Sequence, residues 1–106
     1  MMRRALILFA ALALATPTLA KTPAPVKRGH ELARQVCASC HAVEPGGTSP
    51  EPRAAPLASR DMRHVAGIEG RLARLTREGH YGMPPQALTD EQVRDLLAYI
   101  ESLAPR

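Results

Sequence analysis

The sequence is poor in aromatic residues: its 106 residues include no Trp, one Phe and two Tyr. Phe9 lies in an apolar stretch near the N-terminus, which leaves Tyr81 and Tyr99 as the aromatic side chains of the remaining chain. A small domain with so few large side chains buries a limited core and usually needs a further staple, such as a disulfide, a metal or a cofactor. The composition therefore favours a fold that is stabilised by a disulfide, a metal or a cofactor in addition to its own side chains.

The sequence also lacks an apolar run long enough to span a membrane. The longest uncharged apolar stretch covers residues 5–15, whereas a membrane-spanning helix needs about 20 residues. Arg3 and Arg4 precede the stretch and Thr18-Leu19-Ala20 follows it, which is the pattern of a secretory signal peptide. We expect residues 1–20 to be a signal peptide cleaved after Ala20, with an uncleaved membrane anchor as the alternative. Cleavage would leave no stable membrane insertion and would place the protein in the periplasm.

A large excess of one charge is absent as well. Residues 21–106 form one expected domain and carry 12 Lys and Arg against 10 Asp and Glu. This near balance gives no support for nucleic-acid binding, which usually needs a clustered excess of basic residues. We therefore predict no nucleic-acid partner.

What the sequence does contain is helical periodicity. Apolar residues at helical spacing predict three main helices, over about 26–38, over 62–78, and from Thr89 to a stop at Pro105. Asp61 and Gly79 are the expected caps of the second helix. Thr89 and Gln92 are spaced as a capping box at the start of the third. The strand-like alternation of polar and apolar residues does not occur, so the expected fold class is all-α.

Between the first two predicted helices lies a segment of the opposite kind. Residues 45–56 contain four prolines and two adjacent glycines. Such a composition interrupts regular structure. We expect a long connection there without helices or strands of its own.

The two cysteines of the sequence stand in the pentapeptide Cys37-Ala38-Ser39-Cys40-His41. Cys-x-x-Cys-His is the attachment signature of c-type haem. The two intervening residues allow a helical turn, so that both thiols can form thioethers with the vinyl groups of one porphyrin. A histidine directly after the second cysteine can offer its imidazole to the iron. The motif predicts one covalent haem c, bound by Cys37 and Cys40, with His41 as an iron ligand.

Three other interpretations of the cysteine pair are possible. A thioredoxin-like redox pair would need a βαβ context, which the helical pattern does not provide. A disulfide is compatible with an oxidising compartment, but two residues between cysteines close only a very small loop. A zinc site would need further ligands, and His30, His64 and His80 do not show the usual paired spacing.

A second iron ligand is expected in the segment His80-Tyr81-Gly82-Met83-Pro84-Pro85. Gly82 permits a close backbone approach, and the prolines stiffen the segment that follows. Met83 is the predicted ligand, because Met and His together form a known haem ligand pair that raises the reduction potential. The alternatives are that Met83 only fills core space, or that His80 takes its place.

Taken together, these residues resemble class I c-type cytochromes, the small soluble bacterial cytochromes c, over about residues 26–103. The resemblance rests on Gly29, CASCH, GMPP and LTDEQVRDLLAYIESL. It implies a cytochrome c-like fold, with long loops wrapped around one covalent haem. It also implies that the first and last helices cross near Gly29 and Tyr99. The sequence departs from the family in having Ala33 where an aromatic residue is common, and in lacking a Trp.

The resemblance also implies the iron ligation, with His41 on one side and Met83 on the other. A proline carbonyl in the long connection would accept the free imidazole N–H of His41 and so fix the ring orientation. Pro56 is our choice among the four candidate prolines.

The expected function is periplasmic electron transfer between redox partner proteins, with the iron cycling between Fe(II) and Fe(III). Two axial ligands leave no open site, so the chain is not expected to be an enzyme by itself. The alternatives are a cytochrome subunit of a periplasmic dehydrogenase or oxidase, a haem sensor or peroxidase with an open sixth site, and a haem-free thiol or zinc protein. A set of arginines is either a steering surface for an acidic partner or a solvated helix face: Arg60, Arg63, Arg71, Arg74 and Arg77.

Overall fold

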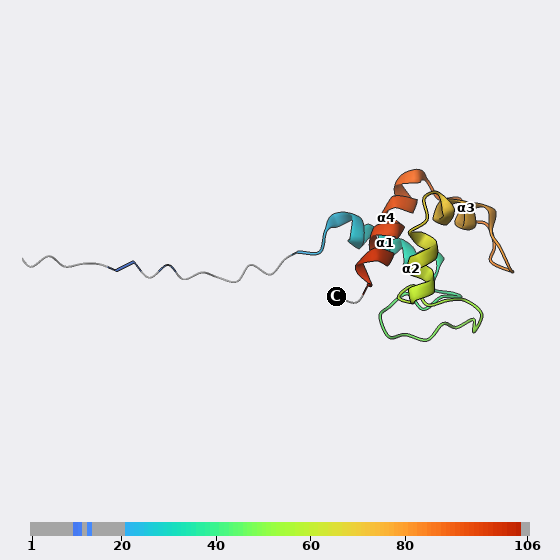
Figure 1. The fold of residues 1–106 in the computed structure, drawn as a ribbon, viewed down its shortest axis with the longest axis horizontal. Coiled ribbons are helices and arrows are strands. Elements are labelled where there is room, and N and C mark those ends of the chain that lie inside the picture. The colour runs from blue at the N-terminus through green and yellow to red at the C-terminus, as the bar shows by residue number, and fades with distance from the viewer. Residues whose placement is uncertain (1–9, 12, 14–20, 105–106) are drawn as a thin grey trace, which may run out of the picture.

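The computed structural model describes residues 10–11, 13 and 21–104. The predicted signal peptide therefore lies outside the described residues, apart from three alanines without regular structure. The described part of the chain forms four helices and no strand, which confirms the all-α prediction (Figure 1). The helices are α1 (Ala24–Val36), α2 (Arg60–Ala66), α3 (Arg71–Glu78) and α4 (Asp90–Ser102). None of the described helices is both long enough and apolar enough to cross a bilayer.

Helices α1 and α4 pack directly across each other, at Gly29 (Figure 1). A Cβ atom on Gly29 would lie 1.9 Å from the carbonyl oxygen of Asp95 and 2.9 Å from Cβ of Tyr99. Only glycine allows two backbones to approach so closely. The expected crossing of the first and last helices near Gly29 and Tyr99 is thus confirmed.

The start of α4 has the predicted capping box. The Thr89 hydroxyl accepts a hydrogen bond from the backbone N–H of Gln92 at 3.1 Å, and the Gln92 side-chain oxygen accepts one from the Thr89 N–H at 2.9 Å. Each residue thereby satisfies a backbone donor that the helix itself leaves free. Farther along α4, the side chains of Leu96 and Ile100 are fully buried and form the centre of the core.

The second predicted helix is divided into α2 and α3. Gly70 adopts a left-handed conformation with φ of 74°, and α3 starts only after it. The prediction of one continuous helix over 62–78 was therefore wrong, because the apolar period runs through a break that glycine makes easy. The start was also misplaced: Ser59, and not Asp61, caps α2, its hydroxyl accepting from the N–H of Met62. Gly79 ends α3 as predicted.

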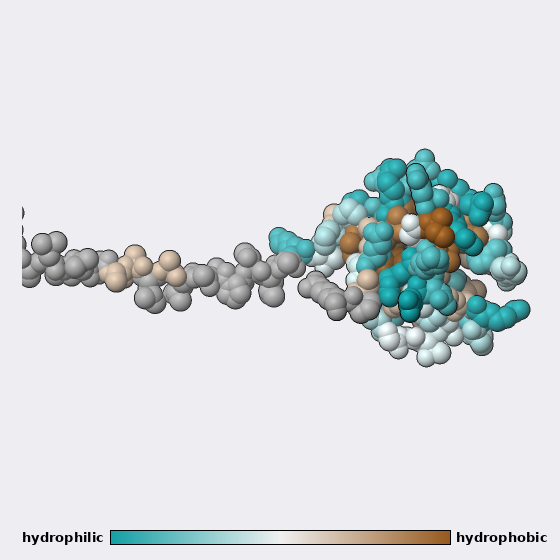
Figure 2. All heavy atoms as spheres, in the orientation of Figure 1, coloured by the Kyte–Doolittle hydropathy of each residue, from teal (hydrophilic) through white to brown (hydrophobic). Residues whose placement is uncertain are grey.

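The core of the described domain is aliphatic apart from one aromatic ring. It gathers small and branched side chains from all four helices and both long connections around Tyr99. Figure 2 shows the visible surface as mostly hydrophilic, with apolar atoms surfacing in the middle of the domain. Among the described residues, the large hydrophobic side chains left exposed are Ile68 and Tyr81.

Candidate functional site

The Cys-x-x-Cys-His motif forms a helix-like turn that continues from the end of α1. The N–H groups of Cys37 and Ala38 both donate to the carbonyl of Ala33, at 2.9 and 3.1 Å. The N–H groups of Cys40 and His41 both donate to the carbonyl of Cys37, at 3.2 and 2.9 Å. Residues three and four apart on such a turn lie on the same side. The fold therefore directs both thiols and the imidazole to one side of the turn.

The two cysteines are not joined in a disulfide and are half-buried at the edge of the core. Burial raises the pKa of the Cys37 thiol to about 11. A redox-active thiol pair needs a lowered pKa, because the thiolate is the reacting species. The structure thus disfavours the thioredoxin-like reading of the pair.

The imidazole of His41 is oriented by a hydrogen bond from Nδ1 to the backbone carbonyl of Ala55, at 2.6 Å. A carbonyl oxygen can only accept, so Nδ1 is the donor in this bond, and Nε2 is the ring nitrogen that remains available to a metal. The choice of Pro56 as acceptor was wrong by one residue. The Pro56 carbonyl accepts instead from the N–H of Ser59 at 2.9 Å, in the turn that leads into α2.

The long connection that contains Ala55 is fastened to the motif at further points. The N–H of Glu51 donates to the Cys40 carbonyl at 3.1 Å, and the N–H of Leu57 donates to the Ala42 carbonyl at 2.9 Å. The Ser49 hydroxyl accepts from the Ala42 N–H at 3.0 Å. The connection has no helix or strand, as predicted, but it has a defined course that holds Ala55 against His41.

Met83 lies in a tight reverse turn between α3 and α4. The N–H of Met83 donates to the His80 carbonyl at 2.7 Å, and the N–H of His80 donates back to the Met83 carbonyl at 3.2 Å. Tyr81 and Gly82, between them, both have positive φ, of 40° and 86°. The two side chains considered as ligands differ in exposure: Met83 is half-buried, whereas His80 is exposed.

The ends of this turn are tied to the helices on both sides. The N–H of Gln86 donates to the Thr76 carbonyl in α3, at 2.7 Å. Arg77 donates to the Leu88 carbonyl at 3.0 Å and to the carboxylate of Asp90 at 2.6 Å. The structure thus joins the motif directly to its own connection, while Met83 is held on a separate segment whose contacts run to α3 and α4.

Other chemistry finds little support in the part of the chain that the structure describes. No group of three or more His, Cys, Asp or Glu residues is arranged there to hold a metal ion. A hollow of about 360 Å³ lies between the α2–α3 connection and α4, lined mainly by small and aliphatic side chains. It contains none of the motif residues, so the chemistry of the site lies elsewhere.

Comparison with known families agrees with the geometry of the motif. The family model described as cytochrome c oxidase, cbb3-type, subunit III matches residues 24–100. The chain belongs to this family. It is a family of c-type cytochromes, so the resemblance to cytochromes c is confirmed, and the cofactor is covalent haem c. No curated protein and no solved structure matches the chain.

The residues present fit this cofactor. Haem c needs two free thiols on one side of a turn and an imidazole nitrogen with an available lone pair. The motif turn, the free cysteines and the Nδ1–Ala55 bond provide all three. Next to the cysteines, Val36 and Ala38 are half-buried against the core and present apolar surface at the same edge.

Two contributors to the site region could not be identified from the sequence. The first is the Ala55 carbonyl, because a backbone acceptor leaves no trace in the residue type. The second is His30, whose ring stacks on Tyr99 with 4.4 Å between ring centroids and 9° between planes. This ring supplies an aromatic partner at the helix crossing, where the family's aromatic position is occupied by the fully buried Ala33.

Proposed function

We propose that this chain is a periplasmic electron carrier with one haem c, held by thioethers to Cys37 and Cys40 and by iron ligation from His41 and Met83. When bound, the haem supplies a one-electron exchange between Fe(II) and Fe(III). The observation that carries the proposal is the motif turn, which brings the two cysteines and His41 to one side while the Ala55 carbonyl holds Nδ1 of the His41 ring. Export rests on the N-terminal pattern of Arg3 and Arg4 followed by an uncharged apolar stretch.

Each protein residue has a separate task in this proposal. The Ala55 carbonyl fixes the orientation of the His41 ring. It also makes Nε2 more basic and therefore a stronger ligand for the iron. Met83 contributes a soft, neutral thioether, a ligand type that raises the reduction potential when it is paired with histidine. Ligands on both sides leave no open position, so the role is electron transfer and not substrate turnover.

The deciding experiment is a pyridine haemochrome assay on protein from a host that matures c-type cytochromes. We expect one haem per chain, retained after denaturation because thioether bonds are covalent. Cys37→Ala should leave one thioether at best, while Ser39→Ala, a change inside the same turn, should leave haem content unchanged. A colourless wild-type product would refute the proposal.

The assignment of Met83 needs a separate pair of variants. Met83→Ala should retain the haem, lose the weak far-red Met–iron band, bind CO readily when reduced and have a lower potential. His80→Ala is the matched control and should keep the wild-type spectrum. The reverse pattern would assign the ligand role to His80.

A second candidate is a cytochrome subunit of an oxidase complex, which the family match favours. The electron chemistry would be the same, but the chain would remain in a fixed assembly. Purification from native cells without overexpression, from both the periplasmic and the membrane fractions, distinguishes the two roles. Co-purification with other chains at a constant ratio indicates a subunit, and recovery as a single haem protein indicates a free carrier.

A further inference from the structure

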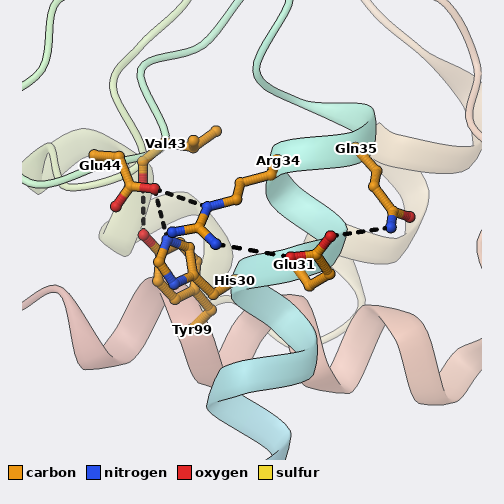
Figure 3. A network of polar contacts seen from close by, with 7 residues as sticks. All are labelled: His30, Glu31, Arg34, Gln35, Val43, Glu44 and Tyr99. Atoms are coloured by element: carbon orange, nitrogen blue, oxygen red, sulfur yellow. Dashed lines mark hydrogen bonds and ion pairs between the residues drawn. The ribbon is translucent and has the colours of Figure 1, made fainter.

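A polar network joins the helix crossing to the segment that follows the motif (Figure 3). His30 lies at its centre, with its ring stacked on Tyr99 of α4. The other edge of the ring meets the connection after α1, where Nε2 of His30 is 2.7 Å from Oε1 of Glu44. Its side chain is 28% exposed, which leaves the ring largely enclosed but within reach of protons from solvent. His30 thus touches both an inner aromatic ring and an outer carboxylate.

The same segment is held at the preceding residue as well. The Tyr99 hydroxyl, buried at the crossing, donates a hydrogen bond to the Val43 carbonyl. Val43 and Glu44 follow His41 by two and three residues. One residue is therefore fixed by its backbone and the next by its side chain, both close to the proposed iron ligand.

Three charged or titratable side chains face His30 from the elements packed against it. Glu44 faces it from the connection, Tyr99 from α4, and Arg34 from α1, where Nε of Arg34 donates to the same Glu44 oxygen at 3.0 Å. Glu31 belongs to the edge of the network, 3.7 Å from Arg34. Hydrogen bonds from His30, and next from Arg34, lower the pKa of the Glu44 carboxyl below its usual value. Glu44 is therefore an anion at any pH near neutrality and is ready to pair with a cationic ring.

We propose that His30 is a positioning residue for the haem side that carries His41, and that its charge couples the reduction potential to pH. A protonated ring forms an ion pair with Glu44 and places a cation over the face of Tyr99. A neutral ring keeps at most a hydrogen bond to the Glu44 carboxylate and loses the attraction between opposite charges. Histidine is the side chain whose charge ordinarily changes between pH 5 and 8. The hold on Glu44 is thus strongest at the acid end of that range. This inference rests on the proposed function, since it needs a bound haem.

The sign of the effect on the potential follows from charge. A positive charge on the ring favours the reduced state of the iron in the same small domain, because the reduced state carries one positive charge fewer. The wild-type potential should therefore fall as pH rises through the histidine range. In His30→Gln the ring charge is absent, so this part of the fall should disappear, and the potential at pH 5 should lie below that of the wild type.

The experiment uses the haem-loaded full chain and three variants, His30→Gln, Glu44→Gln and Glu31→Gln. Potentiometric titration is carried out from pH 5 to pH 8. The control, Glu31→Gln, removes a carboxylate from α1 in the same network without touching Glu44 or Tyr99, and it should keep the wild-type pH profile. His30→Gln combined with Glu44→Gln should add little to either single change, because partners in one contact do not contribute independently.

A second readout does not depend on the haem. The Leu57 N–H donates to the Ala42 carbonyl, next to Val43, so its hydrogen exchange reports opening of this segment. We expect exchange about tenfold faster in His30→Gln and Glu44→Gln than in the wild type, and unchanged in Glu31→Gln. Wild-type profiles for both the potential and the exchange in His30→Gln would overturn the inference, even with lowered global stability. Absence of haem from the wild type would instead overturn the proposed function, which the haemochrome assay detects separately.

Discussion

The two connections that carry the candidate iron ligands are held in different ways. The connection after the motif, residues 42–59, is fastened along its length to the motif turn, to α1 and to the buried Tyr99. The Met83 hairpin, residues 79–88, is fastened at its ends, while Tyr81 at its tip is 98% exposed. One ligand is therefore placed by backbone and side-chain contacts along the whole of its connection, and the other by contacts at the two ends of its hairpin.

This difference indicates where each side of the site is vulnerable. On the motif side, many contacts share the task, so the loss of a single hydrogen bond should be tolerated, but loosening the helix crossing should affect all of them. On the hairpin side, fewer contacts hold the geometry: backbone hydrogen bonds of His80, Met83 and Gln86, and the side chain of Arg77. The predictions that follow test this contrast, beginning with the largest expected effect.

Gly29→Ala should be the most damaging change, because the new Cβ would lie 1.9 Å from the Asp95 carbonyl oxygen and 2.6 Å from its carbonyl carbon. Backbone cannot move aside as a flexible side chain can, so α1 and α4 must separate. We expect a loss of about 3 kcal/mol or more in the free energy of unfolding, measured by denaturant titration of the haem-loaded protein. Gly46→Ala is the control: it has positive φ but nothing within 4 Å of the new Cβ, and it should cost about 1 kcal/mol. If both variants lost the same free energy of unfolding, the close approach of α1 and α4 at Gly29 would not be what stabilises the motif side.

Gly79→Ala should be the most damaging change in the Met83 hairpin. Its φ is 73°, and an added Cβ would lie 2.4 Å from the Met83 carbonyl oxygen and 3.1 Å from the Pro85 nitrogen. The hairpin must then shift, which should cost about 2 kcal/mol and weaken the proposed iron bond of Met83. Faster binding of imidazole or CO to the haem would report that weakening.

Gly82→Ala is the matched variant in the same hairpin. Its φ is 86°, but nothing lies within 4 Å of the added Cβ. The cost should be limited to backbone strain of about 1 kcal/mol, with ligand binding close to that of the wild type. If Gly82→Ala opened the iron position more than Gly79→Ala, crowding against the Met83 carbonyl would not be the controlling contact.

The parts of the fold that could be predicted from the sequence are those that local chemistry determines. Thr89 and Gln92 form the expected box because two side chains three residues apart can reach each other's backbone. The motif turn follows from the fixed spacing of Cys37, Cys40 and His41. The break before α3 was not predicted, because the apolar period continues across it. In the structure, the left-handed backbone at Gly70 separates the two helices.

Other features depend on contacts between distant segments and have no local signature. The carbonyl that accepts from His41 is chosen by the course of the whole connection, so the proline-rich composition indicated the right neighbourhood but the wrong residue, Pro56 for Ala55. The stacking of His30 on Tyr99 joins positions 69 residues apart in the sequence. Neither contact could be derived from periodicity or spacing.

Arg77→Gln should loosen the far end of the Met83 hairpin, since it removes the hydrogen bond to the Leu88 carbonyl and the ion pair with Asp90. The expected cost is about 1 kcal/mol in the free energy of unfolding, because the guanidinium is partly exposed and water compensates some of the loss. Arg74→Gln, one turn earlier on the exposed face of α3, should cost less than about 0.5 kcal/mol. Denaturant titration of both variants measures the difference in the free energy of unfolding. Equal losses in the two variants would mean that the Arg77 contacts do not stabilise the hairpin.

The smallest expected effect is an acid-dependent one, and it compares the two regions directly. Hydrogen bonds from Arg28 lower the pKa of Asp95 at the helix crossing, and one from Arg77 lowers the pKa of Asp90 beside the hairpin. A lowered carboxyl pKa stabilises the fold at pH values above the ordinary carboxyl range, and this stability is lost as the pH falls through the lowered pKa. The side chain of Asp95 is 10% exposed and that of Asp90 is 79% exposed, so water screens the second pair far more. Between pH 6 and pH 3, Asp95→Asn should therefore reduce the pH dependence of unfolding more than Asp90→Asn does. The reverse order would mean that the hairpin, and not the crossing, is the acid-sensitive part of the domain.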